Sequence, residues 1–75
     1  MPRYYLEIEF EQDEEAIENG TPPEIIRMQV NNETEAKTLY NMIKPAISDR
    51  KHRAYFHICH HSKEGNAPCE RIPIL

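Results

Sequence analysis

The sequence YYLEIEFE at residues 4–11 alternates apolar side chains with mostly acidic ones. This period of two is typical of a β-strand with one buried face, because successive side chains of a strand point to opposite faces. The same alternation returns at residues 26–30 and at residues 54–60. We therefore expect three strands with a common buried face, the first two of them paired as an antiparallel hairpin.

Residues 33–47 have the spacing of an amphipathic helix instead. Asn32 and Glu35 are suited to cap its start, because an Asn side chain can accept a hydrogen bond from an exposed backbone N–H. Pro45 cannot donate a backbone hydrogen bond, so we expect the helix to kink there or to continue as a short turn through Ser48. The apolar stripe of the helix consists of Ala36, Leu39, Tyr40, Ile43 and Ile47.

The end of the chain predicts a last short strand around Ile72 and Ile74, placed at the sheet margin because Pro73 cannot donate to a strand ladder. Residues 11–23 form a long connection with a helical turn at residues 13–18. The whole order predicts one α+β domain over residues 1–75. Its architecture is ββαββ, a four-stranded, mainly antiparallel sheet with one helix packed on one face.

Two registers compete for the last hairpin. In one of them Ile58 faces Ile72 across the strands. In the other, Cys59 faces Cys69 at a separation that a disulfide could close, but Ile58 then faces Glu70. Apolar residues pair favourably across strands, so the sequence favours the first register.

Composition narrows the class of protein. The 75 residues are 39% hydrophobic and 29% charged, which is typical of one folded domain. No apolar run approaches the roughly 20 residues that span a bilayer, and the N-terminus lacks the apolar block of a signal peptide. Two cysteines are too few for a secreted disulfide framework. We expect a cytoplasmic protein with no membrane contact.

The sheet face opposite the helix is the first candidate binding surface. The predicted alternation places Tyr5, Arg27, Tyr55 and His57 there, and Tyr and Arg are enriched at protein interfaces. We expect a small non-enzymatic interaction domain that binds a protein partner, or a second copy as a homodimer, through this open face or the C-terminal edge strand. No catalytic residue is assigned, because no group is identified that would orient a Cys and His pair.

A zinc site is the alternative, with His57, Cys59, His61 and Cys69 as ligands. Thiolate and imidazole are ligands that zinc prefers, and the alternation places the first three on one strand face. The register that pairs Ile58 with Ile72 would add Cys69 opposite His61. The spacing matches neither paired CxxC motifs nor helix-borne ligand pairs. The sequence therefore favours a domain without a cofactor over one that binds zinc.

An RNA-binding domain is a third and weaker interpretation. The basic run DRKHR at residues 49–53 leads into Tyr55, an aromatic side chain on the open face. The formal net charge of −4 and the acidic first strand would repel phosphate. We therefore do not expect nucleic acid as a partner.

Overall fold

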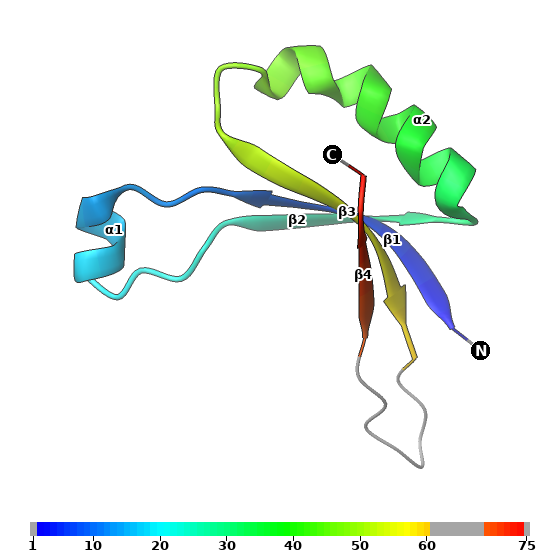
Figure 1. Ribbon diagram of the computed structural model, residues 1–75, viewed down its shortest axis with the longest axis horizontal. Coiled ribbons are helices and arrows are strands. Elements are labelled where there is room, and N and C mark those ends of the chain that lie inside the picture. Colours follow the sequence, from blue (N-terminus) through cyan, green and yellow to red (C-terminus); the bar gives the residue numbers. More distant parts are fainter. Residues whose placement is uncertain (1, 61–68, 75) are drawn as a thin grey trace.

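Antiparallel pairing organises the whole molecule. The computed structural model describes residues 2–60 and 69–74, and it contains one four-stranded sheet in the order β2-β1-β3-β4 (Figure 1). All neighbouring strands are antiparallel. The expected α+β class and the ββαββ order are confirmed. The strands are β1 (Arg3–Phe10), β2 (Ile25–Val30), β3 (His52–Cys59) and β4 (Glu70–Pro73).

The connection between β1 and β2 extends well beyond the sheet and carries the short helix α1 (Glu14–Glu18) at its far end (Figure 1). Asp13 caps this helix, because its Oδ1 accepts a hydrogen bond of 2.8 Å from the backbone N–H of Ala16. Gly20 follows with a φ of 70°, a left-handed conformation that glycine adopts without steric cost. The helical turn expected at residues 13–18 is thus confirmed.

The long helix α2 (Glu33–Ile43) begins at the predicted cap and continues into the 3₁₀ helix η1 (Lys44–Ile47). Asn32 Oδ1 accepts a hydrogen bond of 2.8 Å from the backbone N–H of Glu35. The tighter turn of η1 begins next to Pro45, as expected from its missing N–H. Among the described residues, no helix is both long and apolar enough to cross a membrane.

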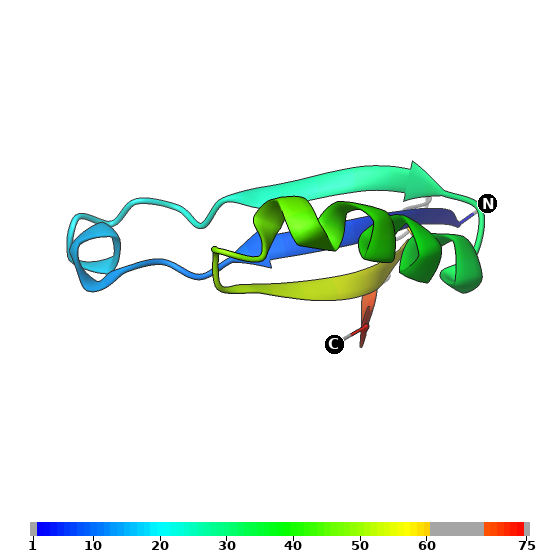
Figure 2. The ribbon, with the colours of Figure 1, turned by 90° about the horizontal axis from the view of Figure 1, so that it is seen from above.

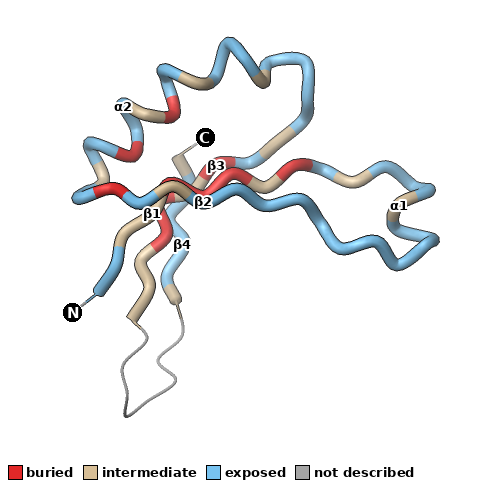
Figure 3. The backbone as a smooth tube through the Cα atoms, turned by 180° about the vertical axis from the view of Figure 1, so that it is seen from behind, coloured by how far each residue is buried: buried red, intermediate tan, exposed pale blue. Residues whose placement is uncertain are grey.

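The core lies between α2 and the sheet, and its centre is formed by β1 and β3. Figure 3 shows the buried positions concentrated on these two strands and on the sheet-facing side of α2. Met28, Leu39, Ile43 and Ile58 pack against this core but are only partly buried. The buried apolar residues are Leu6, Ile8, Phe10, Val30, Ala36, Tyr40, Ala54 and Phe56.

Tyr40 is a polar member of this core. Its hydroxyl lies 2.8 Å from His52 Nε2, and His52 Nδ1 lies 2.7 Å from the carbonyl oxygen of Arg50. A carbonyl can only accept, so Nδ1 carries the proton of the neutral ring and Nε2 accepts from the Tyr40 hydroxyl. Burial raises the pKa of Tyr40, because the phenolate would lose its hydration.

The register expected for the last hairpin is wrong. In the structure Ile58 faces Glu70, Phe56 faces Ile72 and His57 faces Arg71. This is the alternative register, shifted by two residues, and its consequence is that Cys59 and Cys69 approach each other.

The observed register is explained by charge. Arg71 Nε donates a hydrogen bond of 2.7 Å to Glu7 Oε2, and Arg71 Nη2 donates one of 2.9 Å to Glu9. In the expected register Arg71 would move two residues along the strand, about 7 Å away from Glu7. Partnering a buried carboxylate therefore outweighs the Ile58 to Ile72 pair, and Ile72 stays 40% exposed at the sheet edge.

We predict that Leu6→Ala destabilises the domain by about 2–5 kcal/mol, because Leu6 is fully buried and its truncation leaves a cavity. Ile17→Ala is the matched control, since Ile17 is 63% exposed on α1 and should change stability by less than about 0.5 kcal/mol. Urea unfolding followed by circular dichroism measures both. Equal effects of the two variants would contradict this core.

We predict a second effect at alkaline pH. A raised folded-state pKa means that the stability from the neutral Tyr40 phenol is complete below pH about 10 and is lost as the pH rises through that raised pKa. Near neutral pH, Tyr40→Phe should cost about 0.5–1.5 kcal/mol through the lost hydrogen bond to His52. Melting temperatures from pH 8 to 11 should show the gap between the two proteins closing. Parallel curves would refute a buried Tyr40 hydroxyl.

Candidate metal centre on the open sheet face

The sheet face opposite α2 carries a buried carboxylate. Glu7 points away from the helix, yet it is only 1% exposed. Arg27 Nε of β2 donates a hydrogen bond of 2.8 Å to Glu7 Oε1, and Arg71 Nε of β4 donates one of 2.7 Å to Oε2. Burial alone would raise the pKa of Glu7, but the hydrogen bonds and charges of the two arginines outweigh it and hold this pKa below its usual value.

Arg71 reaches Glu7 by crossing β3. Its guanidinium lies over the ring of Tyr55, 4.1 Å from the centroid, in a cation–π contact. The same guanidinium also pairs with Glu9. The network therefore includes side chains from all four strands, with Arg27 at one end and Arg71 at the other.

His57 lies next to Glu7 on this face and is 6% exposed. Its Nδ1 is 3.1 Å from Glu7 Oε1, within ion-pair range. No hydrogen bond to this buried nitrogen is formed within the described residues, so proximity to Glu7 does not satisfy it. The ring of Tyr5 packs edge-on against the imidazole, with the centroids 5.9 Å apart.

Two thiols adjoin His57. Cys59 ends β3, Cys69 immediately precedes β4, and the Cys69 thiol donates to Cys59 Sγ across 3.6 Å. This hydrogen bond and partial burial raise the pKa of Cys69. The sulfur separation exceeds the roughly 2.05 Å of a disulfide bond. It is close to the roughly 3.8 Å between two thiolates that bind one tetrahedral zinc ion with Zn–S bonds of about 2.3 Å.

His57, Cys59 and Cys69 thus form one cluster, which we call the CCH cluster. One ring nitrogen and both sulfurs lie within 4.8 Å of one another, close enough to bind a single ion. The fourth predicted ligand, His61, lies outside the described residues. His60 is oriented differently, because its Nε2 is 3.4 Å from Glu70 Oε2.

The structure places the four predicted binding residues on the same face but gives them internal contacts. Arg27 binds Glu7, Tyr55 lies under Arg71, and Tyr5 contacts His57. Sequence reasoning did not identify Glu7 and Arg71 as the centre of this face. The available signal was that the β1 to β2 hairpin register sets Glu7 opposite Arg27.

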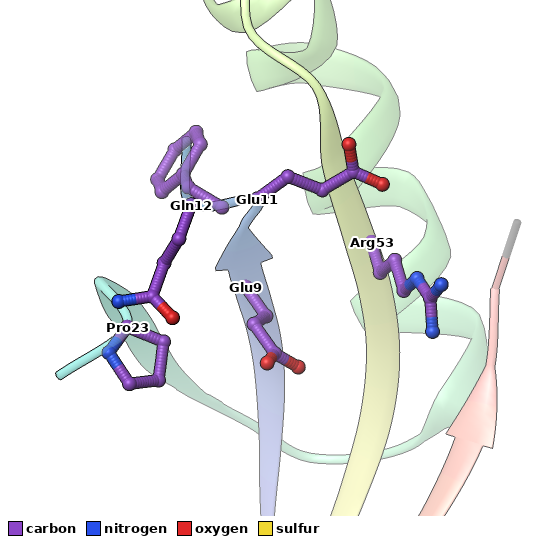
Figure 4. A pocket seen from close by; sticks show the side chains of 6 residues that line it. Glu9, Glu11, Gln12, Pro23 and Arg53 are labelled. Carbon is purple, nitrogen blue, oxygen red and sulfur yellow. The ribbon is translucent and has the colours of Figure 1, made fainter. Parts of the chain in front are cut away.

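A separate pocket of about 130 Å³ lies near the end of β1, where the chain leaves the sheet toward α1 (Figure 4). Its lining includes two acidic side chains, Glu9 and Glu11, and one cationic side chain, Arg53. Within the described part of the chain this lining contains no imidazole or thiol. The pocket therefore lacks the donor types that make the CCH cluster a candidate site.

Comparison with known proteins assigns neither a family nor a function to this chain. No family model matches the chain, and no curated protein or solved structure matches it. The functional argument therefore depends on the chemistry of the residues themselves.

We predict that Glu7→Gln lowers the free energy of unfolding by about 1–3 kcal/mol, because an amide cannot accept equally from two arginines and leaves a buried polar group poorly satisfied. Glu9→Gln is the matched control, because Glu9 is on the same strand face, is more exposed, and pairs with Arg71 alone among the described residues. This change should cost under about 1 kcal/mol. Chemical denaturation compares the variants. A greater loss from Glu9→Gln would rule out Glu7 as the centre of the network.

Proposed function

We propose that this domain binds one thiophilic transition-metal ion, with zinc as the leading candidate, through His57, Cys59 and Cys69. The observation that carries the proposal is the convergence of one imidazole nitrogen and two sulfurs within 4.8 Å. Soft thiolates combined with imidazole favour zinc or monovalent copper over magnesium or calcium, which take oxygen ligands.

Glu7 supports this proposal because its carboxylate lies beside His57. Histidine ligands of metals commonly use their second ring nitrogen to contact a carboxylate, which orients the ring. Nδ1 of His57 is the nitrogen beside Glu7, so Nε2 is the one left to bind the ion. The two arginines that neutralise Glu7 keep this carboxylate ionised, which suits the orienting role.

The proposed role of the ion is structural and non-enzymatic. Cys59 ends β3 and Cys69 immediately precedes β4, so an ion bound by both would hold β4 against β3. A chain of 75 residues has a small core, and a metal is one of the common ways to stabilise such a domain. A cytoplasmic location fits this role, because thiols stay reduced there. The described residues supply three ligands, and the fourth coordination position is left to water, an outside ligand or the predicted ligand His61, which lies outside the described residues.

We predict that the reduced protein takes up one zinc or cobalt ion per chain. At a free metal concentration one hundred times Kd, binding should stabilise the domain by about 2.7 kcal/mol and raise the melting temperature by about 10–20 °C. Cobalt gives thiolate-to-metal absorption that reports the sulfur ligands directly. Cys59→Ser should abolish this absorption and the stabilisation, because a thiolate ligand is lost.

His60→Ala is the matched control for this experiment. His60 is adjacent to Cys59 but contacts Glu70 on the edge, so its loss should leave stoichiometry and absorption unchanged. His57→Ala should weaken binding while the two thiolates still give a sulfur signal. Wild-type protein that folds equally well in chelator and holds no stoichiometric metal would refute the proposal.

A protein-interaction domain is the second candidate, and it is favoured by the two edges of the sheet, which have no neighbouring strand among the described residues. The open face is less suited to this function than the sequence implied, because Arg27 and Tyr55 are engaged within the molecule. The edge strands β2 and β4 present backbone N–H and C=O groups instead. The two strands differ in length and in residue composition.

A further inference from the structure

The outer edge of β2 has no neighbour among the described residues. The strand order places β2 at the margin, paired with β1 alone. Figure 2 shows α2 lying above β1 and beside β3, while β2 runs along the side of the sheet that the helix leaves uncovered. Ile26 is therefore 40% exposed even though it is on the helix side of the sheet.

Hydrogen bonding defines which backbone groups of β2 point outward. The N–H of Phe10 donates a bond of 3.0 Å to the carbonyl of Glu24, at the start of the β1 to β2 ladder. Alternate residues of an antiparallel strand point their backbone groups to opposite sides. The backbone groups of Ile26, Met28 and Val30 therefore bond to β1. The backbone N–H and C=O groups of the residues between and before them point outward. That outward set is Ile25, Arg27 and Gln29.

This edge lacks the features that usually prevent strand addition. Natural edge strands are protected by prolines, lysines, inward charges or shortness. The β2 sequence IIRMQV contains no proline or lysine, and its one charge, Arg27, is paired with Glu7. The opposite edge, β4, spans four residues and includes Glu70 and Pro73. The two edges therefore differ in their readiness to accept another strand.

We propose that a second copy of this chain adds to the outer edge of β2, antiparallel and related by two-fold symmetry. The favoured register places Met28 opposite Met28 of the second copy, so that Ile26 faces Val30 and Arg27 faces Gln29. The outward groups of Arg27 and Gln29 then exchange hydrogen bonds. A shift of two residues would place Arg27 opposite itself, and like charges directly opposite are destabilising.

The product is one continuous sheet of eight strands, twice the four of a single chain, with both α2 helices on the same face. The exposed helix-side surface of Ile26 then packs against Val30 of the second copy. Edge pairing of a strand of this length buries less area than a standard stable interface, so the proposal is a reversible dimer that depends on concentration.

Sedimentation equilibrium of the full chain tests this, in buffer with reductant and chelator so that neither disulfides nor metal contribute. Across a hundredfold range of concentration, the average mass of the wild type should rise from one chain toward two. Wild-type protein that stays monomeric up to its solubility limit would overturn the proposal.

Three variants locate the interface. Gln29→Pro removes an outward N–H without touching the β1 ladder, and it should give a folded monomer. Ile26→Lys should raise the dissociation constant about tenfold, because symmetry removes the Ile26 to Val30 pair twice. Ile72→Lys is the matched control, since Ile72 is also 40% exposed but is on β4, and it should leave the dimer intact.

Circular dichroism at low concentration verifies that each variant is folded. A dimer that survives Ile26→Lys but is lost in Ile72→Lys would assign the contact to the C-terminal edge and overturn the β2 proposal.

Discussion

A buried carboxylate must have cationic or hydrogen-bonding partners, and in this domain that requirement falls on Glu7. Its position in the central strand β1 removes it from water on the side away from the helix. Arg27 and Arg71 meet the requirement from the two edge strands. Leaving such a charge unpaired costs more than pairing it returns in stability, so we interpret the network chiefly as a constraint on which strands align, and where.

The arrangement of the candidate metal centre follows from this constraint. Arg71 can reach Glu7 only when it faces His57, and that register brings Cys69 level with Cys59. The CCH cluster is therefore a consequence of the charge network, whose β4 member Arg71 lies two residues after Cys69. The same carboxylate lies 3.1 Å from the imidazole of the cluster, which links the fold's main electrostatic constraint to its candidate chemistry.

Features governed by short sequence separation were predictable from the sequence. Alternation located the strands, and the Asn32 cap and Pro45 defined the course of α2. The β4 register was not predictable by the same means, because pairwise matching of Ile58 with Ile72 considers only adjacent strands. Arg71 acts across β3 on β1, a contact between strands that are not neighbours. For the same reason Glu7 had the pattern of a solvated strand residue, and the expected ligand set paired Cys69 with His61 instead of Cys59.

The proposed metal centre and the proposed dimer contact lie at opposite edges of the sheet. The CCH cluster lies where β3 meets β4, while the unprotected edge is β2, with β1 between them. Antiparallel addition at β2 would therefore place the two β4 strands, and both metal centres, at the outer margins of the extended sheet. Bound metal would then hold the short outer strand β4 in place, while the inner strand β2 gains its missing neighbour from the second copy. Under these two proposals each edge of the small sheet has its own means of stabilisation, a metal at β4 and a second chain at β2.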